Sequence, residues 1–260
     1  MSLPADFTIV VPTYNECDRL GTLLERVFHA CERDGLAVEV VIVDDNSADG
    51  TGIVADEWAR QQRVRVIHRA GKLGLGTAVL EGFAAAQTAI VGVMDGDLSH
   101  PPELLPRLFR TMAGGGFDVV VGSRYVDGGG TSNFSLGRWL LSRAGCWLAR
   151  PLTPVRDPMS GFFLMRRAHL DGFRTSVSGF KIGLELLVRT RPRQVAEIGY
   201  VLVGRTLGAS KMSLTEATGF LQQLISLYRH VLTAPVRRPA RVTIVAGAEP
   251  ATTSPFLSGA

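Results

Sequence analysis

The chain has 260 residues, of which 46% are hydrophobic and 20% charged, with a formal net charge of +4 at pH 7. This profile is typical of a soluble globular protein of one large or two small domains, and it excludes a chain dominated by low-complexity sequence. The three cysteines are odd in number and far apart, which argues against a disulfide framework or a zinc site and favours a reduced, cytosolic setting.

The N-terminal stretch "MSLPADFTIVVP" has no basic region and no small-residue cleavage site, so it does not predict a secretory signal. No run reaches the ~18 uncharged apolar residues of a membrane-spanning helix. We therefore expect neither a signal peptide nor a transmembrane segment.

Five apolar, β-rich runs separated by helical patterns dominate the first half, at 7–11, 38–43, 64–67, 89–94 and 117–122. This βαβ rhythm predicts an α/β fold with a mostly parallel sheet covered by helices on both faces. Between the first two runs, apolar residues recur at three- and four-residue spacing from Leu20 to Cys31, as in an amphipathic helix packed on a sheet.

The second half is less regular. Segment 134–152 predicts a helix with tryptophans among arginines, which suits either a membrane interface or ordinary packing. A strand within 157–167, a helix at 181–189 and a strand at 195–203 follow. The last helix begins at the capping-box signature "SLTE" (213–216), and its apolar stripe predicts docking on the core or on a bilayer.

We therefore predict one domain over 1–234, with a nucleotide-binding half at about 1–122 and an acceptor half at about 123–234. The tail, 235–260, is rich in Pro, Arg, Ala, Thr and Ser. Apart from "VTIV" (242–245), this composition predicts disorder.

Acidic side chains follow three of the predicted strands, in "PTYNE" (12–16), "DDNS" (44–47) and "DGDLSH" (95–100). Ligands of open α/β sheets bind beyond the carboxyl ends of the strands, and clustered acids there imply a cation or ligand donors. Asp95 and Asp97 point to the same side of an extended backbone, so both can reach one Mg²⁺ or Mn²⁺.

Basic residues are concentrated late in the chain. From Lys181 to Arg241 there are ten basic residues and three acidic ones. This asymmetry predicts an anionic partner, such as a phosphate ligand, an anionic lipid or a nucleic acid, although a solvated basic surface is an alternative.

Taken together and in order, several segments resemble the family-two glycosyltransferases, and more narrowly the polyprenyl (dolichyl) phosphate mannose synthases. The match runs from about Phe7 to Leu232. The segments are "TIVVPTYNE", "VIVDDNSADGT", "KLGLGTA", "VMDGDLSHPPE", "VVVGSRYVDGG", "DPMSGFFLMRR", "GFKIGLELLVR" and "GRTLGASK". The resemblance implies a GT-A fold and an inverting transfer of mannose from GDP-mannose to a polyprenyl phosphate.

By resemblance, the guanosine pocket is lined by residues of the first two strand ends, namely Pro12, Tyr14, Glu16, Val43 and Asp45. Asp95, Gly96 and Asp97 meet the metal and the diphosphate, with Asp97 as a catalytic residue. Some relatives place a glutamine two residues after the second aspartate as a further metal ligand. This chain has Ser99 there, a weaker donor, so Ser99 is a tentative ligand that water can replace.

The resemblance also assigns roles to several basic residues. Arg124, Arg138 and Ser142 are expected to contact the acceptor phosphate, the two arginines as catalytic residues, and Arg124 also lies in the donor site. Lys181, Arg205 and Lys211 match positions that reach the donor's phosphates or sugar. Asp157 is expected to position a basic side chain or the sugar.

Such a transfer needs no catalytic base. A phosphate monoester has a second pKa of ~6, so the acceptor oxygen is mostly ionised at pH 7. The enzyme then holds that oxygen in line with C1 of mannose and stabilises charge at both ends.

Three alternatives remain at this stage. One is glycosyl transfer from a UDP-sugar to the same lipid phosphate. The second is a nucleotide-binding oxidoreductase, disfavoured by the D-x-D motif and by the incomplete glycine fingerprint in "GKLGLGTA". The third, a nucleic-acid binder, rests on basic charge alone, and we expect no nucleic acid as partner.

The expected acceptor is a membrane lipid, so we expect a peripheral protein on the cytoplasmic face of a membrane. Contact is expected through the 134–152 helix, the 213–232 helix or a small membrane-anchoring subunit.

Overall fold

The computed structural model describes residues 4–173, 181–204, 214–234 and 239–246. Two of the expected phosphate-binding residues, Arg205 and Lys211, lie outside the described residues, as do 235–238 and 247–260 of the predicted tail.

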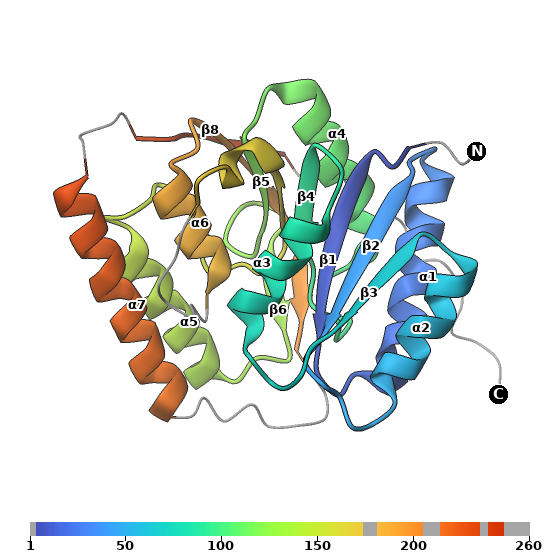
Figure 1. The fold of residues 1–260 in the computed structure, drawn as a ribbon. Coiled ribbons are helices and arrows are strands. Elements are labelled where there is room, and N and C mark those ends of the chain that lie inside the picture. Colours follow the sequence, from blue (N-terminus) through green and yellow to red (C-terminus); the bar gives the residue numbers. More distant parts are fainter. Residues whose placement is uncertain (1–3, 174–180, 205–213, 235–238, 247–260) are drawn as a thin grey trace.

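An eight-stranded mixed sheet forms the centre of the molecule (Figure 1), in the order β10-β8-β5-β7-β4-β1-β2-β3. All of its neighbouring strands are parallel except β7, which runs antiparallel to both β4 and β5. The strands are β1 (Phe7–Thr13), β2 (Val38–Asp44), β3 (Val64–His68), β4 (Ile90–Val93), β5 (Val119–Ser123), β7 (Phe163–Arg166), β8 (Gln194–Gly199) and β10 (Arg241–Val245).

Helices cover both faces of the sheet, as the sequence predicts. One face packs against α1 (Cys17–Arg33), α2 (Thr51–Gln61) and α4 (Leu105–Gly115) in a first core cluster. The other packs against α3 (Leu75–Ala85) and α6 (Ile182–Thr190) in a second core cluster.

The side chains of neighbouring strand residues explain the two clusters. Ile9 and Val11 of β1 enter the first cluster, whereas Val10, between them, enters the second. Successive residues of a strand point to opposite faces, so a sheet covered on both sides needs apolar residues at every position. This is why the central strands stand out in the sequence as mostly apolar runs, and two buried polar residues within β1 and β2, Thr8 and Glu39, hydrogen-bond to each other at 2.8 Å.

The outer helices α5 (Leu136–Ala149) and α7 (Leu214–Thr233) lie beside α6 in Figure 1. Cys146 and Ala149 of α5 and Leu224 and Leu227 of α7 join a third core cluster with residues of α6. The apolar stripe of α7 therefore docks on the protein, while Leu221, Ile225 and Leu232 of the same helix stay exposed.

Two sequence expectations need correction. The strand expected over 195–203 is two strands, because the chain leaves the main sheet after Gly199, and β9 (Val201–Val203) pairs with β6 (Gly130–Ser132) in a separate two-stranded sheet. The sheet also extends past residue 234, where we ended the domain: β10, which contains the 242–245 segment, pairs in parallel with β8.

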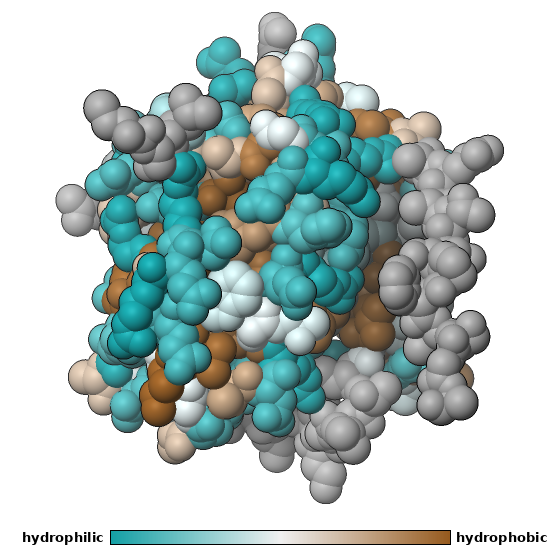
Figure 2. All heavy atoms as spheres, turned by 90° about the vertical axis from the view of Figure 1, so that its right-hand side faces the viewer, coloured by the Kyte–Doolittle hydropathy of each residue, from teal (hydrophilic) through white to brown (hydrophobic). Residues whose placement is uncertain are grey.

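The face that carries α1 and α2 is mostly hydrophilic, with small apolar patches (Figure 2). Exposed large apolar side chains are instead frequent on α5. Within the described ranges, no helix combines the length and the apolar character needed to cross a bilayer.

Candidate functional site

The three acidic strand ends are neighbours in space. β1 lies between β2 and β4 and is parallel to both, so the carboxyl ends of all three strands meet at one edge of the sheet. The segments after them carry Tyr14 and Glu16, Asp45, and the Asp95–Asp97 pair. The topology thus joins residues that are up to about 80 positions apart in the chain.

The D-x-D segment forms a tight turn after β4, which ends at Val93, and this corrects the extended backbone from which we expected Asp95 and Asp97 to point to the same side. Leu98 has a φ of 63°, in the left-handed region, and the Ser99 main-chain N–H donates to Asp97 Oδ1 at 3.0 Å. Gly96 is buried against β1, where an added Cβ would come within 3.3 Å of Thr13 Cγ2. A side chain at position 96 would therefore fit only if Thr13 shifted by a few tenths of an ångström.

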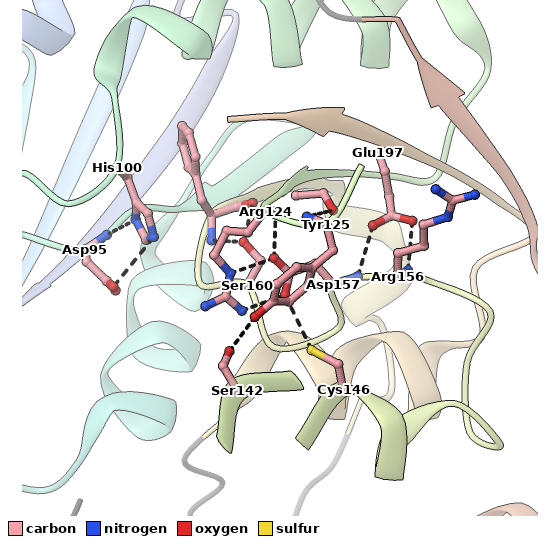
Figure 3. A network of polar contacts seen from close by, with 12 residues as sticks. Asp95, His100, Arg124, Tyr125, Ser142, Cys146, Arg156, Asp157, Ser160 and Glu197 are labelled. Carbon is pink, nitrogen blue, oxygen red and sulfur yellow. Dashed lines mark hydrogen bonds and ion pairs between the residues drawn. The ribbon is translucent and has the colours of Figure 1, made fainter. Parts of the chain in front are cut away.

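His100 contacts both the main chain and the carboxylate of Asp95. The Asp95 main-chain N–H donates to His100 Nδ1 at 3.1 Å, and His100 Nε2 lies 3.8 Å from Asp95 Oδ2 (Figure 3). The ring is 2% exposed and stacks on Phe162 with 5.1 Å between centroids. Burial lowers the pKa of His100, against the opposing charges of Asp95 and Asp97, so the ring is neutral at pH 7 and its proton is on Nε2.

The donor set of the turn fits a divalent cation that keeps open positions. Asp95 and Asp97 offer hard carboxylate oxygens, the ligands that Mg²⁺ and Mn²⁺ prefer. Among the described residues no group of three or more His, Cys, Asp or Glu side chains forms a closed metal site. A cation held here would complete its shell with phosphate oxygens and water. Ser99 is buried, and its role as a third ligand stays a prediction.

At the end of β1, an exposed aromatic ring and a buried carboxylate lie close together in sequence. Tyr14 is 42% exposed, and Lys72 Nζ lies 3.9 Å above its ring. The Glu16 carboxylate is buried and accepts from Arg19 Nη1 at 2.9 Å, and Pro12 is half-buried. The Tyr14 ring is therefore the open surface of this part of the site.

The two expected pocket residues at the end of β2 differ in what they can offer. The Val43 side chain is fully buried in the second core cluster, so only its main chain can contact a ligand. Asp45 Oδ1 pairs with the Arg69 guanidinium, and the Gly74 N–H donates to Asp45 Oδ2 at 3.1 Å. Asp45 thus ties the turn before α3 to the end of β2.

A buried ion pair fixes Arg124 after β5. Its Nε and Nη2 donate to the two oxygens of Asp157 at 2.7 Å each, and its main-chain N–H donates at 2.9 Å (Figure 3). Desolvation alone would lower the pKa of Arg124, but the hydrogen bonds and charge of Asp157 raise it. Of the two roles expected for Asp157, holding a basic side chain is the contact found.

Asp157 is itself held in place by a second acid. The fully buried Glu197 carboxylate accepts from the main-chain N–H groups of Arg156 at 2.8 Å and Asp157 at 3.1 Å. Burial raises the pKa of Glu197, and these N–H donors act in the opposite direction. The Arg124 guanidinium is therefore held by the buried Asp157 carboxylate, and the Asp157 main chain is held in turn by the buried Glu197 carboxylate.

The other expected acceptor-phosphate residues lie on α5, one turn apart, as predicted. Tyr125 Oη donates to Ser142 Oγ at 2.7 Å, which links α5 to the segment of Arg124. Arg138 is exposed, and its guanidinium lies 4.2 Å from the Phe134 ring centroid. The two α5 side chains thus have different partners in this structure.

Lys181 precedes α6 and belongs to the same region. Lys181 is an exposed residue, yet desolvation of its ammonium lowers the pKa, as does the charge of Arg124, while Asp95 and Asp157 act in the opposite direction. Lys181 is therefore within electrostatic reach of both the D-x-D turn and the buried ion pair.

Comparison with known proteins identifies the family. The family model described as glycosyl transferase family 2 matches residues 8–173. A dolichol-phosphate mannosyltransferase of Saccharomyces cerevisiae is 36% identical over 234 residues, which cover 86% of this chain and 87% of that protein. The chain belongs to glycosyltransferase family 2.

Two further relatives of this glycosyltransferase have similar names. A polyprenol monophosphomannose synthase of Mycolicibacterium smegmatis is 37% identical over 79% of this chain and 80% of that protein. A dolichol-phosphate mannosyltransferase of Pyrococcus furiosus is 35% identical over 85% of this chain, but the chain spans only 63% of that protein's length.

Solved structures of glycosyltransferases share the fold. S. aureus TarS in complex with UDP-GlcNAc matches with a TM-score of 0.66 at 16% identity, covering 89% of this chain and 68% of that one. A Pyrobaculum calidifontis mannosyltransferase in complex with GDP-Man and Mn²⁺ matches with a TM-score of 0.61 at 18% identity, covering 91% and 67%. The expected GT-A-type fold is confirmed.

Some residues of the glycosyltransferase site were missed in the sequence. His100 and Tyr125 stand inside motifs that we quoted, directly beside residues that we selected, and Glu197 is an acid within the apolar strand "VAEIGYVLV". An acid inside an apolar run is a detectable signal, because a buried carboxylate needs donors. The identity of those donors is not readable from the local sequence.

Proposed function

We propose that this glycosyltransferase transfers mannose from GDP-mannose to a polyprenyl (dolichyl) phosphate, inverts the anomeric centre and releases GDP. The observation that carries the proposal is the 35–37% identity to relatives named dolichol-phosphate mannosyltransferase or polyprenol monophosphomannose synthase, over 79–86% of this chain. The geometry of the site supports it at both the donor end and the acceptor end.

At the donor end, the exposed Tyr14 ring suits stacking on the base. Pro12, Glu16, Asp45 and the Val43 main chain line the rest of the nucleoside pocket. The carboxylates of Asp95 and Asp97, next to Gly96, would hold Mg²⁺ or Mn²⁺, with Ser99 or water as a further ligand. A divalent cation bound there neutralises the negative charge of the departing GDP.

At the acceptor end, Arg124, Arg138 and Ser142 bind the lipid phosphate. Arg124 uses Nε and Nη2 for Asp157, and its Nη1 makes no hydrogen bond to the residues that the structure describes, so it can donate to a ligand. A guanidinium locked in this way keeps its donors aligned without loss of side-chain entropy on binding. Lys181, Arg205 and Lys211 bind the phosphates or sugar of the donor.

The chemical step is an in-line displacement. An ionised oxygen of the lipid phosphate forms the new bond to C1 of mannose while the bond from C1 to the diphosphate oxygen breaks, and its electron pair leaves with GDP. No proton has to be removed. In agreement, the acids that the described structure places around Arg124 already have hydrogen-bond partners: Asp157 accepts from Arg124, and Glu197 accepts from main-chain N–H groups.

A peripheral position on the cytoplasmic face of a membrane would bring the enzyme to its acceptor. The helix α5, which carries Arg138 and Ser142, exposes large apolar side chains beside its arginines, namely Leu136, Trp139, Leu140, Leu141, Trp147 and Leu148. Such a face suits the interface of a bilayer. A small membrane-anchoring subunit is the other way to hold the enzyme there.

The test is direct transfer. Purified full-length protein is incubated with Mn²⁺ or Mg²⁺, a short polyprenyl phosphate, and either radiolabelled GDP-mannose or UDP-glucose, followed by extraction of the lipid. We expect labelled lipid from GDP-mannose. Label from UDP-glucose alone would instead support the alternative of glycosyl transfer from a UDP-sugar.

A further inference from the structure

A polar side chain of α7 is fully buried where α7 packs against α6. Gln223 of α7 is 0% exposed, whereas the neighbouring Gln222 is exposed to solvent. Burying an amide is costly unless its hydrogen bonds are satisfied. Gln223 therefore requires partners, and it finds them on α6.

Gln223 hydrogen-bonds to both the N–H and the carbonyl oxygen of Lys181. Gln223 Oε1 accepts from the Lys181 N–H at 3.3 Å, and Gln223 Nε2 donates to the Lys181 carbonyl oxygen at 3.1 Å. The same Nε2 donates to Glu185 Oε2 at 3.0 Å. One side chain thus supplies the acceptor for the Lys181 N–H and a second donor for the Lys181 carbonyl oxygen, which also accepts from the Glu185 N–H.

Lys181 needs such support because it stands outside the regular helix. It is the residue that precedes α6, and its backbone has φ −120° and ψ 79°, outside the helical region. The Lys181 carbonyl already accepts the first hydrogen bond of α6, from the Glu185 N–H at 3.2 Å, but the N–H of an N-cap residue has no intrahelical acceptor. The Gln223 amide supplies the missing restraint.

The docking of α7 depends on the same cluster of polar groups. Glu185 is fully buried and pairs with Arg189, whose Nη2 donates to Ser226 Oγ of α7 at 3.0 Å. These contacts accompany the apolar third cluster, in which Leu224 and Leu227 are buried. Any displacement of α7 from α6 therefore also releases the Lys181 backbone.

We propose that Gln223 is a positioning residue that sets the place of the Lys181 ammonium by holding its main chain, and that donor binding thereby depends on the docking of α7. The inference rests on the proposed role of Lys181 as a ligand of the donor phosphates or sugar. It adds a residue on α7 that touches neither substrate, and it makes α7 part of the donor site.

The experiment compares the affinity for GDP-mannose with Mn²⁺, by calorimetry, in Gln223→Met, the matched surface variant Gln222→Met, Lys181→Met and the Lys181→Met/Gln223→Met double variant. Methionine keeps the length of glutamine and removes its hydrogen bonds. We expect Gln223→Met and Lys181→Met each to weaken binding about tenfold, the loss of one hydrogen bond to a charged or positioned group. Gln222→Met should have no effect. If Gln223→Met does not fold, Gln223→Asn, which keeps the amide but shortens its reach, takes its place.

The double variant separates positioning from stability. If Gln223 acts through Lys181, the double variant binds donor as weakly as Lys181→Met, while the melting temperature falls by the same amount in both backgrounds. Full additivity in donor affinity, or no loss in Gln223→Met beside a loss in Lys181→Met, overturns the inference and leaves the proposed function standing. No loss in Lys181→Met overturns the assignment of Lys181 itself.

Discussion

Replacing Asp157 by Asn tests whether the buried ion pair supports Arg124. Asp157 is 0% exposed and Arg124 9%, and three N–H groups of Arg124 donate to the carboxylate. Asparagine has nearly the same shape, so no cavity forms, but its NH₂ group would face N–H donors and the Arg124 charge would lose its counter-charge. Breaking a buried pair in this way costs about 3–5 kcal/mol, or about 6–20 °C in melting temperature for a domain of this size.

An exposed pair with the same fork geometry provides the control. Arg26 Nε and Nη2 donate to the two oxygens of Glu103 at 2.8 and 2.9 Å, and both side chains are more than 40% exposed. Exposed pairs contribute about 0.2–1 kcal/mol, so Glu103→Gln should shift the melting temperature by less than about 4 °C. Circular dichroism during heating and in urea gives both values. Equal falls in melting temperature in the two variants would refute the reasoning that burial makes the Arg124–Asp157 pair costlier to break than an exposed pair.

Two further predictions follow from burial around the site. His100→Phe keeps a ring on Phe162 but offers no acceptor to the Asp95 N–H, so it should raise the Mn²⁺ concentration for half-maximal activity about tenfold. His100→Asn should change this concentration far less. Similar Mn²⁺ concentrations for the two variants would contradict a supporting role of His100. Burial raises the pKa of the Cys31 and Cys146 thiols to about 12, so at pH 8 an aromatic disulfide reagent should modify Cys17 alone in the native protein and all three cysteines after unfolding. Rapid native modification of Cys146 would show that α5 opens readily.

The sheet was predictable to the extent that its strands are buried on both faces. β2 has all seven residues buried and coincides with an apolar run that needs no other signal. β7 shows the limit, because its residues predict a strand but not its insertion, antiparallel, between β4 and β5. Partner choice depends on the whole chain, and no local pattern encodes it.

The break between β8 and β9 has a cause that lies elsewhere in the chain. A Cβ on Gly199 would come within 2.2 Å of the Asp127 carbonyl oxygen, so the backbone of the 127–129 segment passes directly over this glycine. The sequence shows a glycine inside an apolar run, which suggests a close approach but does not say of what. One strand was therefore expected where the chain changes sheets.

The candidate site was predictable where residues are exposed to ligands, and much less where they support one another. Asp95, Asp97 and Arg124 stand at strand ends, the position where ligands of such sheets bind. Gln223 stands on the buried stripe of α7, next to Leu224, where a polar residue is out of place. That signal marks a buried amide but gives no indication that its partner is Lys181.

The central claim is that Asp95 and Asp97 bind a divalent cation together with the diphosphate of the donor. Calorimetric titration of GDP into the protein, with Mn²⁺ and with EDTA, tests it most directly, alongside Asp97→Asn, which keeps an acceptor for the Ser99 N–H. We predict that chelation weakens GDP binding more than about tenfold, which is more than the loss of a supporting residue costs. In Asp97→Asn, the affinity for GDP should be the same with Mn²⁺ and with EDTA. Equal affinity for GDP in Mn²⁺ and in EDTA would contradict the account.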